Sequence, residues 1–100
     1  MNGIRQYSLQ EMATILRPIA DEYNVTGISL FGSRARGDFD DDSDYDLLIE
    51  VTDDFSFGDY GAFIDETSRA LGSSVDVITR RSLTDCESDR RILEDEVRVL

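Results

Sequence analysis

Residues 30–49 constrain this chain more than any other stretch of its sequence. They run from an apolar segment into Gly32 and Ser33, cross an acidic loop, and continue into a second apolar segment that carries Asp44 and Asp46. Alternate residues of a strand point to the same side, so Asp44 and Asp46 present two carboxylates together. Like charges this close repel each other unless one is protonated or a cation lies between them. Because hard oxygen ligands of this kind suit Mg²⁺, the pair predicts part of a metal site.

The residues before the acidic loop have the chemistry of a phosphate-binding turn. Gly32 permits a close approach of the backbone, and Ser33 offers a hydroxyl and is able to begin a helix whose free N–H groups favour an anion. Arg34 and Arg36 carry guanidinium forks that match phosphate oxygens. The loop over residues 38–42 is expected to be solvated, and its negative potential would attract Mg²⁺ or a cationic partner.

The spacing from Gly32-Ser33 through ten intervening residues to Asp44-x-Asp46 resembles the signature of the DNA polymerase beta-like nucleotidyltransferase superfamily. In a chain of 100 residues, the whole of residues 30–49 resembles the smallest members of that superfamily, the MNT-type (minimal nucleotidyltransferase) proteins. The resemblance implies their nucleotidyltransferase fold. The order of strands and helices agrees with it, since it predicts an α/β (α+β) class with a small mixed β-sheet and flanking helices.

Asp76 interrupts an otherwise apolar, β-branched segment, where a charge needs a partner or a metal. Taken alone, this pattern favours an aspartate at a strand edge or in a salt bridge. The superfamily carries a third carboxylate on a following strand at about this distance, so the resemblance implies a catalytic, metal-binding triad of Asp44, Asp46 and Asp76. In that triad Asp44 and Asp46 hold two Mg²⁺ ions, and Asp76 binds the catalytic ion and accepts the proton of the attacking hydroxyl.

The resemblance also implies how the nucleotide is held. ATP would be the donor, and Gly32 and Ser33 would bind its β- and γ-phosphates. Arg36 is a further candidate for a phosphate contact, although a structural role at the junction of loop and helix stays open for it.

Three strands are expected, over residues 26–31, 45–51 and 74–79. The apolar density of residues 45–51 is typical of a strand that is buried on both faces in the middle of a sheet. The first strand delivers Gly32 at its C-terminal end, and ligand sites of open α/β sheets lie at such strand ends.

Helices are expected over residues 8–23, over residues 59–71, and from Ser88 or Asp89 through Leu100. Ser8 and Glu11 have the spacing of a capping box, which marks the start of the first helix. Pro18 lies inside that helix and removes a backbone donor, so we expect a kink or a break near Arg17. Gly72 is the expected stop of the second helix.

The composition limits the classes of partner and chemistry. The length suits one domain over residues 1–100. Ten basic and twenty-two acidic residues leave a net charge of −12, which disfavours binding to nucleic acid and to anionic membranes. The single cysteine, Cys86, cannot form an intramolecular disulfide, and the lack of histidine excludes His-based catalysis and His-ligated zinc. With no leader-like or membrane-spanning apolar run in the sequence, we expect a soluble, cytoplasmic protein.

The resemblance further implies a partner protein. MNT-type proteins are commonly paired with a HEPN-type partner, usually a ribonuclease toxin, and some transfer AMP from ATP to a tyrosine of that toxin. We therefore expect a Mg²⁺-dependent, type VII-like antitoxin that forms a hetero-oligomer with its cognate HEPN toxin. Two alternatives stay open: a non-catalytic antitoxin that neutralises a basic partner by binding alone, and a nucleotidyltransferase for a small molecule such as an aminoglycoside.

Overall fold

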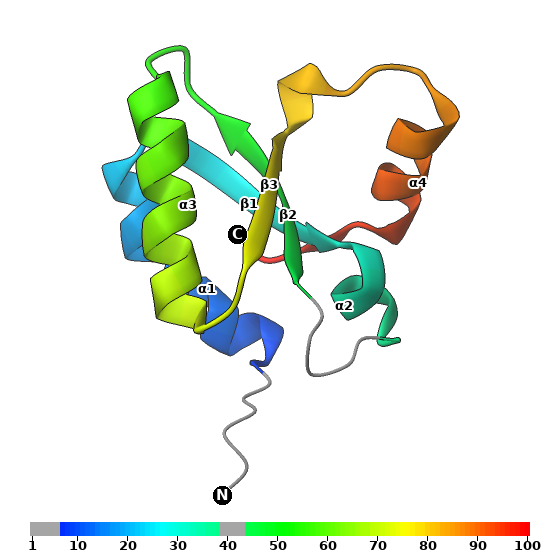
Figure 1. Ribbon diagram of the computed structural model, residues 1–100, viewed down its shortest axis with the longest axis horizontal. Coiled ribbons are helices and arrows are strands. Elements are labelled where there is room, and N and C mark those ends of the chain that lie inside the picture. The colour runs from blue at the N-terminus through cyan, green and yellow to red at the C-terminus, as the bar shows by residue number, and fades with distance from the viewer. Residues whose placement is uncertain (1–6, 39–43) are drawn as a thin grey trace, which may run out of the picture.

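The computed structural model of the chain describes residues 7–38 and 44–100. Within them the structure has a four-stranded sheet in the order β3-β2-β1-β4 (Figure 1). The strands are β1 (Val25–Phe31), β2 (Tyr45–Val51), β3 (Val75–Thr79) and β4 (Val97–Arg98). The helices are α1 (Leu9–Glu22), α2 (Gly32–Arg36), α3 (Phe57–Leu71) and α4 (Glu87–Asp95), with a 3-10 turn, η1 (Arg80–Ser82), after β3. This mixed α/β architecture with flanking helices confirms the predicted fold class.

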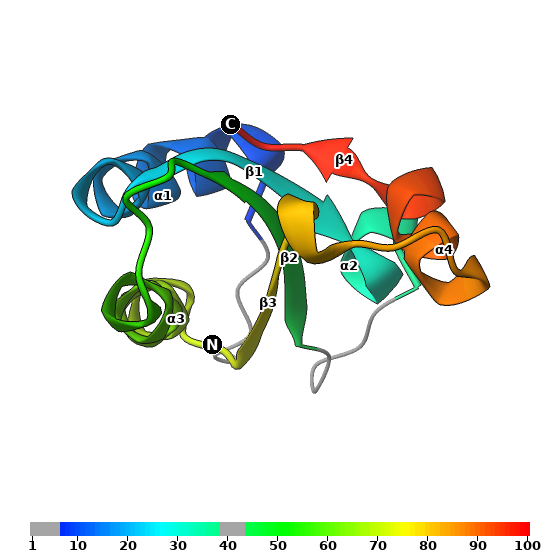
Figure 2. The same cartoon turned by 90° about the horizontal axis from the view of Figure 1, so that it is seen from above.

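The sheet is mixed because it contains both antiparallel and parallel strand pairs. Strand β1 pairs antiparallel with β2 and with β4, whereas β2 and β3 are parallel. Helices α1 and α3 cover one face of the sheet, and α2 and α4 lie on the other side (Figure 2). The hydrophobic core lies under α1 and α3, where Leu16, Leu47 and Phe63 have no exposed surface. On the opposite face, β2 carries Asp46 and Glu50 on either side of the buried Leu48.

Helix α1 begins with the predicted capping box. The Ser8 hydroxyl accepts a hydrogen bond from the Glu11 N–H at 3.0 Å, and the Glu11 carboxylate accepts one from the Ser8 N–H at 2.9 Å. Of the kink or break predicted near Arg17, the break is wrong, since α1 is one helix with Pro18 inside it. Buried side chains on both sides of the proline, including Leu16 and Ala20, pack in the same core and keep the helix continuous.

Helix α3 starts two residues earlier than predicted, because a second capping box marks its N-terminus. The hydroxyl of Ser56 accepts from the Asp59 N–H at 3.1 Å, and the Asp59 carboxylate accepts from the Ser56 N–H at 3.2 Å. The helix ends at Gly72 as predicted, where the backbone is left-handed (φ +67°).

The C-terminal segment corrects the prediction of a helix that runs from Ser88 or Asp89 to Leu100. Helix α4 begins at Glu87 and ends at Asp95, and the chain then forms β4. Val97 pairs with Leu30 and Arg98 with Ser29. The free edge of β1 supplies these backbone partners, which overrides the helical spacing of the apolar residues. Among the described residues, no helix combines the length and the apolar character that crossing a membrane requires.

Candidate active site

Strand β2 carries the first two predicted carboxylates in the middle of the sheet. Leu47, Leu48 and Ile49 are at most 1% exposed, which confirms the predicted burial of this strand on both faces. Strand alternation sends Leu47 and Ile49 into the core under α1 and α3. Asp44 and Asp46 therefore belong to the opposite face, at the end of β2 that follows the acidic loop.

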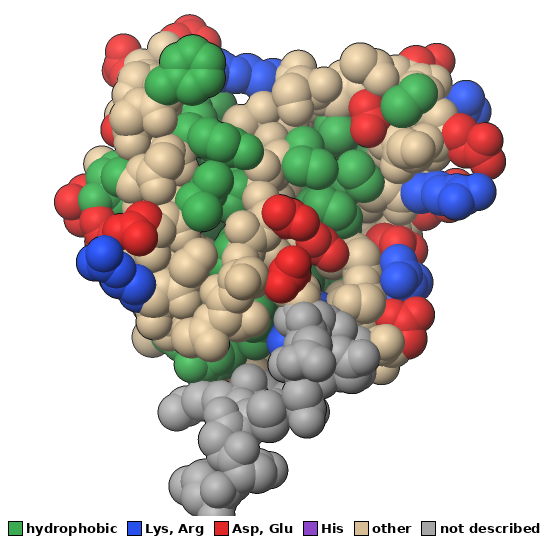
Figure 3. All heavy atoms as spheres, in the orientation of Figure 1, with side chains coloured by type: hydrophobic (Ala, Val, Ile, Leu, Met, Phe, Trp, Pro, Cys, Tyr) green, Lys and Arg blue, Asp and Glu red, His purple; other side chains and the backbone are tan. Residues whose placement is uncertain are grey.

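Asp76 lies directly across from Asp46. The two residues are partners in the parallel register of β2 and β3, so the third predicted carboxylate is next to the first two. Burial raises the pKa of the Asp46 carboxyl, and the negative charges of Asp76 and Asp44 raise it further, against a smaller opposite effect of Arg36. Acidic side chains gather near the middle of this face of the molecule (Figure 3). The structure thus brings together all three carboxylates that the sequence singled out.

The three carboxylates are neighbours and do not form a preformed set of ligands. Within residues 7–38 and 44–100, no three acidic, histidine or cysteine side chains already lie close enough together to enclose a metal ion. Asp46 is half-buried, whereas Asp44 and Asp76 are exposed. Exposed aspartates change rotamer at low cost, so the two outer carboxylates can adjust around the inner one.

Gly32 brings the predicted phosphate-binding turn against Asp46. Its backbone is left-handed (φ +73°), and a Cβ at this position would lie 2.3 Å from the Asp46 Oδ2 atom. Only glycine satisfies both conditions. Phe31, the last residue of β1, is the antiparallel partner of Asp46, which holds the turn and the carboxylate at the same end of the sheet.

Helix α2 contains the rest of the predicted phosphate-binding turn. Ser33 lies in its first turn, and the Ser33 carbonyl accepts hydrogen bonds from the N–H groups of Gly37 (2.9 Å) and Asp38 (3.1 Å). Gly37 ends the helix in a left-handed conformation (φ +87°). Of the acidic loop that the sequence indicated, Asp38 is described and exposed, and residues 39–42 lie outside the described residues.

Arg36 already has two carboxylate partners. Its Nε donates to Asp38 at 3.1 Å, and its Nη1 donates to Asp95 of α4 at 2.8 Å. These hydrogen bonds raise the pKa of the Arg36 guanidinium above its ordinary value. The contact with Asp95 ties α2 to α4, in line with the structural role that the sequence left open for this arginine.

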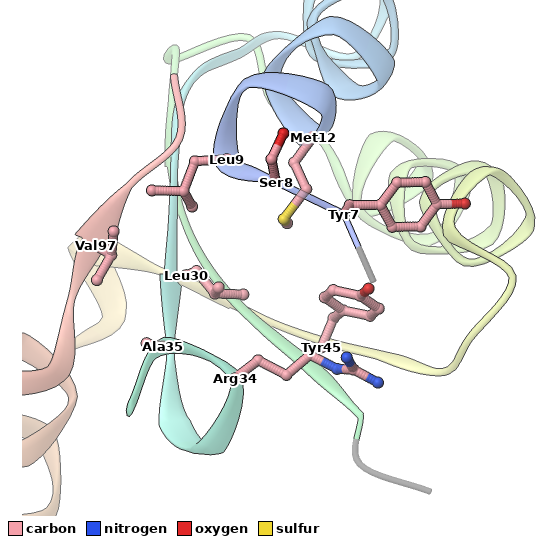
Figure 4. Close-up of a pocket in the computed structure, with 9 residues that line it drawn as sticks. All are labelled: Tyr7, Ser8, Leu9, Met12, Leu30, Arg34, Ala35, Tyr45 and Val97. Atoms are coloured by element: carbon pink, nitrogen blue, oxygen red, sulfur yellow. The ribbon is translucent and has the colours of Figure 1, made fainter. Parts of the chain in front are cut away.

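Arg34 and Tyr45 make a contact that sequence reasoning missed. The Arg34 guanidinium carbon lies 4.0 Å from the centre of the Tyr45 ring, a cation–π contact between α2 and β2. Both residues line a cavity of about 330 Å³ among α1, α2 and β4, on the core side of the sheet (Figure 4). Alternation along β2 puts Tyr45, between the two aspartates, on the opposite face from them. The sequence could therefore have predicted the face on which Tyr45 lies. It could not predict the contact with Arg34, which depends on how α2 packs against β2.

A charged network joins the C-terminal segment to the same side of the sheet. Arg80 pairs with Glu96 and, at 3.5 Å, with Glu50, and Arg98 pairs with Glu50 at 3.0 Å. The buried hydroxyl of Ser29 donates to Glu96 at 2.6 Å. The hydrogen bond from Arg80, followed by that from Ser29, lowers the pKa of Glu96. Arg80 is thus held in a structural network of ion pairs.

The sequence matches a known domain family over most of its length. Residues 12–100 match the family model for the nucleotidyltransferase domain. A protein of Methanocaldococcus jannaschii named "Putative protein adenylyltransferase MJ1379" is 36% identical over 98 residues, which cover 92% of this chain and 98% of that protein. A second protein of the same organism, "Putative protein adenylyltransferase MJ0435", is 34% identical over 93 residues, which cover 93% of this chain and 99% of that protein.

Solved structures share the fold at lower sequence identity. A structure described as a "putative minimal nucleotidyltransferase" has a TM-score of 0.75 and 22% identity, with 92% of this chain and 96% of that chain covered. A toxin–antitoxin structure with AMP-PNP has a TM-score of 0.73 and 19% identity over 88% of this chain and 72% of that chain. A complex of a tri-AMPylated Shewanella oneidensis HEPN toxin with MNT antitoxin has a TM-score of 0.67 and 17% identity over 93% and 72%. At these identities the likeness concerns the fold.

Proposed function

The chain belongs to the nucleotidyltransferase domain family, and from this premise we propose that it is a Mg²⁺-dependent antitoxin that transfers AMP from ATP to a tyrosine of a HEPN-domain toxin. The single observation that carries the proposal is the cross-strand register of Asp46 and Asp76 beside the Gly32 turn. The relatives named as protein adenylyltransferases support a protein as acceptor. The similar fold of MNT antitoxins in complexes with HEPN toxins supports the choice of partner.

The donor set fits magnesium. Asp44, Asp46 and Asp76 offer only hard carboxylate oxygens, the ligands that Mg²⁺ prefers together with substrate phosphates. The raised pKa of Asp46 supports the fit, because its main causes are burial and neighbouring carboxylates that a divalent cation would neutralise. When bound, two Mg²⁺ ions would neutralise the triphosphate and make the acceptor hydroxyl more acidic.

The transfer step uses residues of α2 and β3. Gly32 and Ser33 bind the β- and γ-phosphates, which orients the α-phosphorus toward Asp76. The oxygen of the acceptor tyrosine forms a bond to the α-phosphorus, the bond from that phosphorus to the β-phosphate oxygen breaks, and pyrophosphate leaves. Asp76 takes the proton of the tyrosine hydroxyl. No histidine is needed, since carboxylates serve as metal ligands and as the base.

A labelling experiment tests the proposal. The purified chain is incubated with Mg²⁺, ATP labelled on the α-phosphate, and a HEPN-domain protein encoded beside its gene. We expect label on the HEPN protein, at a tyrosine identified by peptide mapping, and we expect chelation of Mg²⁺ with EDTA to abolish it. Absence of label on a well-folded HEPN protein would contradict the proposal.

Two variants separate catalysis from binding alone. Replacing Asp44 and Asp46 together by Asn should remove both the label and the protection of cells from the toxin. Asp53→Asn, which alters an exposed aspartate in the turn after β2, is the matched control and should retain both. Protection that survives the double replacement would instead support an antitoxin that neutralises its partner by binding.

A further inference from the structure

A cavity of about 610 Å³ lies at the far end of β3 from Asp76, between that strand and the start of α3. We call it the α3–β3 groove. Its walls include Phe55, Phe57, Tyr60, Val77 and Ile78. Hydrophobic side chains are visible along the gap between α3 and β3 at the upper end of the face shown in Figure 3. Its volume and apolar walls are those of a binding site.

Phe57 is the most unusual residue of the groove. Its side chain is 96% exposed, more than twice the exposure of the other two large hydrophobic residues that are exposed in the described part of the chain, Leu9 and Leu93. A phenylalanine gains stability by leaving water, so one held almost fully in solvent is available to a partner. Aromatic side chains of this kind commonly act as anchors at protein interfaces.

Hydrogen bonds hold the walls of the groove in place without any occupant. The capping box of Ser56 and Asp59 sets the first turn of α3 and with it the position of Phe57. The Tyr60 hydroxyl donates to the Val77 carbonyl at 2.6 Å, which ties α3 to β3. Phe55 meets the Tyr60 ring edge-to-face at a centroid distance of 6.3 Å. Binding to such a preorganised groove costs little conformational entropy.

The rim of the groove carries a positive charge. Arg81 is exposed and, among residues 7–38 and 44–100, takes part in no ion pair, whereas the neighbouring Arg80 is paired with Glu50 and Glu96. Within the described part of the chain, the Arg81 guanidinium is therefore open to an acidic group of a partner. The groove therefore suits an apolar segment that has a carboxylate beside it.

The groove and the candidate active site belong to one surface. Ile78 lines the groove and lies two residues after Asp76 on β3, so both side chains point to the same side of the strand. At about 3.3 Å per residue, this part of the groove begins roughly 7 Å along the strand from Asp76. Figure 3 shows the exposed hydrophobic side chains and the acidic side chains on the same face. A protein held in the groove would thus have neighbouring residues within reach of the carboxylates.

We propose that the α3–β3 groove docks the acceptor protein through an apolar segment next to a carboxylate, with Phe57 as the anchor and Arg81 as the charge partner. The inference rests on the proposed function, since the acceptor is the HEPN-domain protein. A second copy of this chain is a poorer occupant, because two molecules of net charge −12 repel each other.

The test measures binding in the absence of nucleotide, by isothermal titration of the HEPN-domain protein. Phe57→Ser and Arg81→Glu should each weaken its affinity by about tenfold or more, the effect expected for interface anchors. The loss with Arg81→Glu should shrink as salt is raised, since salt screens charges. Leu93→Ser, on α4, and Arg69→Glu, near the end of α3, are the matched controls and should stay within about twofold.

A transfer assay then separates docking from chemistry. Phe57→Ser should raise the KM for the HEPN protein and leave the KM for ATP unchanged. If the unaltered chain binds the HEPN protein through Phe57 but transfers no AMP, the docking proposal is supported and the proposed function fails. Equal affinities for all four variants would overturn docking at the groove. Docking of the HEPN protein would also be overturned if Phe57→Ser removed self-association in sedimentation experiments and left the affinity for the HEPN protein unchanged. The groove would then join two copies of this chain.

Discussion

The two faces of strand β2 differ in function, although their residues alternate along the same strand. Toward α1 and α3 the strand presents Leu47 and Ile49, which have no exposed surface. Toward the other side it presents Asp46, whose pKa is raised by burial and by two neighbouring carboxylates. The first face stabilises the fold, whereas the second face keeps like charges together at an energetic cost. Such a cost at one end of a well-packed strand is typical of a functional site.

A substitution on the core face of β2 should have the largest effect on stability. Leu47→Ala should lower the free energy of unfolding by about 2–5 kcal/mol, because it leaves a cavity where the side chain is fully buried. Urea denaturation followed by circular dichroism measures this change. The folded fraction should keep its transferase activity. A specific activity that fell in proportion to stability would show that the core face also affects catalysis.

On the carboxylate face of β2, a substitution should lower activity without lowering stability. Asp46→Asn should lower kcat for AMP transfer by about 100-fold or more, equivalent to about 2.7 kcal/mol, because it removes a central metal ligand. Stability should stay the same or rise, because the substitution removes a half-buried charge that its neighbours repel. Single-turnover transfer and thermal unfolding check the two parts. A large drop in melting temperature would show that Asp46 is a structural residue.

Unlike Asp46, Glu96 is an acidic side chain that stabilises the fold, because it is paired with Arg80. Its pKa is lowered below the ordinary value of 4.5 by Arg80 and Ser29, so its stabilising effect is complete above pH 4.5 and is lost as the pH falls through the lowered pKa. Glu96→Gln should cost about 1 kcal/mol at pH 7, since the ion pair is partly exposed and screened by solvent. The difference in melting temperature between the two proteins should vanish in acid. A difference that is constant from pH 7 to pH 3 would contradict this assignment.

Two tyrosine hydroxyls offer the smallest and most closely matched comparison. The buried hydroxyl of Tyr45 has no hydrogen-bond partner in the described part of the chain, whereas that of Tyr60 donates to the Val77 carbonyl. Tyr45→Phe should therefore be neutral or slightly stabilising, and Tyr60→Phe should cost about 1 kcal/mol. Thermal unfolding of both variants measures the difference. Equal losses would mean that the Tyr45 hydroxyl has a partner after all.

Much of the site could be predicted from short stretches of sequence. The spacing of Asp44 and Asp46 along one strand puts both carboxylates on one face, and Gly32 is required where the backbone turns against Asp46. The role of Asp76 was different: its residue type and its strand could be predicted, but the pattern alone favoured an aspartate at a strand edge or in a salt bridge. Only the parallel pairing of β2 and β3 makes it the partner of Asp46.

The C-terminal segment shows where sequence patterns fail. Ile92 and Leu93 have helical spacing and do lie in α4, yet Val97 continues the same spacing and forms a strand. The reason is the free edge of β1, a tertiary feature that local propensity cannot contain. The docking proposal has the same origin, since Phe57 and Ile78 are 21 positions apart and line one groove only because α3 packs beside β3.

The sequence by itself determined the features that depend on near neighbours. These are the capping box at Ser8, the alternation of core and carboxylate residues on β2, and the glycine turn at the end of β1. Tertiary structure decided which distant residues meet: Asp46 with Asp76, Arg34 with Tyr45, and α3 with β3. The physical reason is that capping and alternation follow from backbone geometry within a few residues, whereas contacts between elements depend on how the whole core packs.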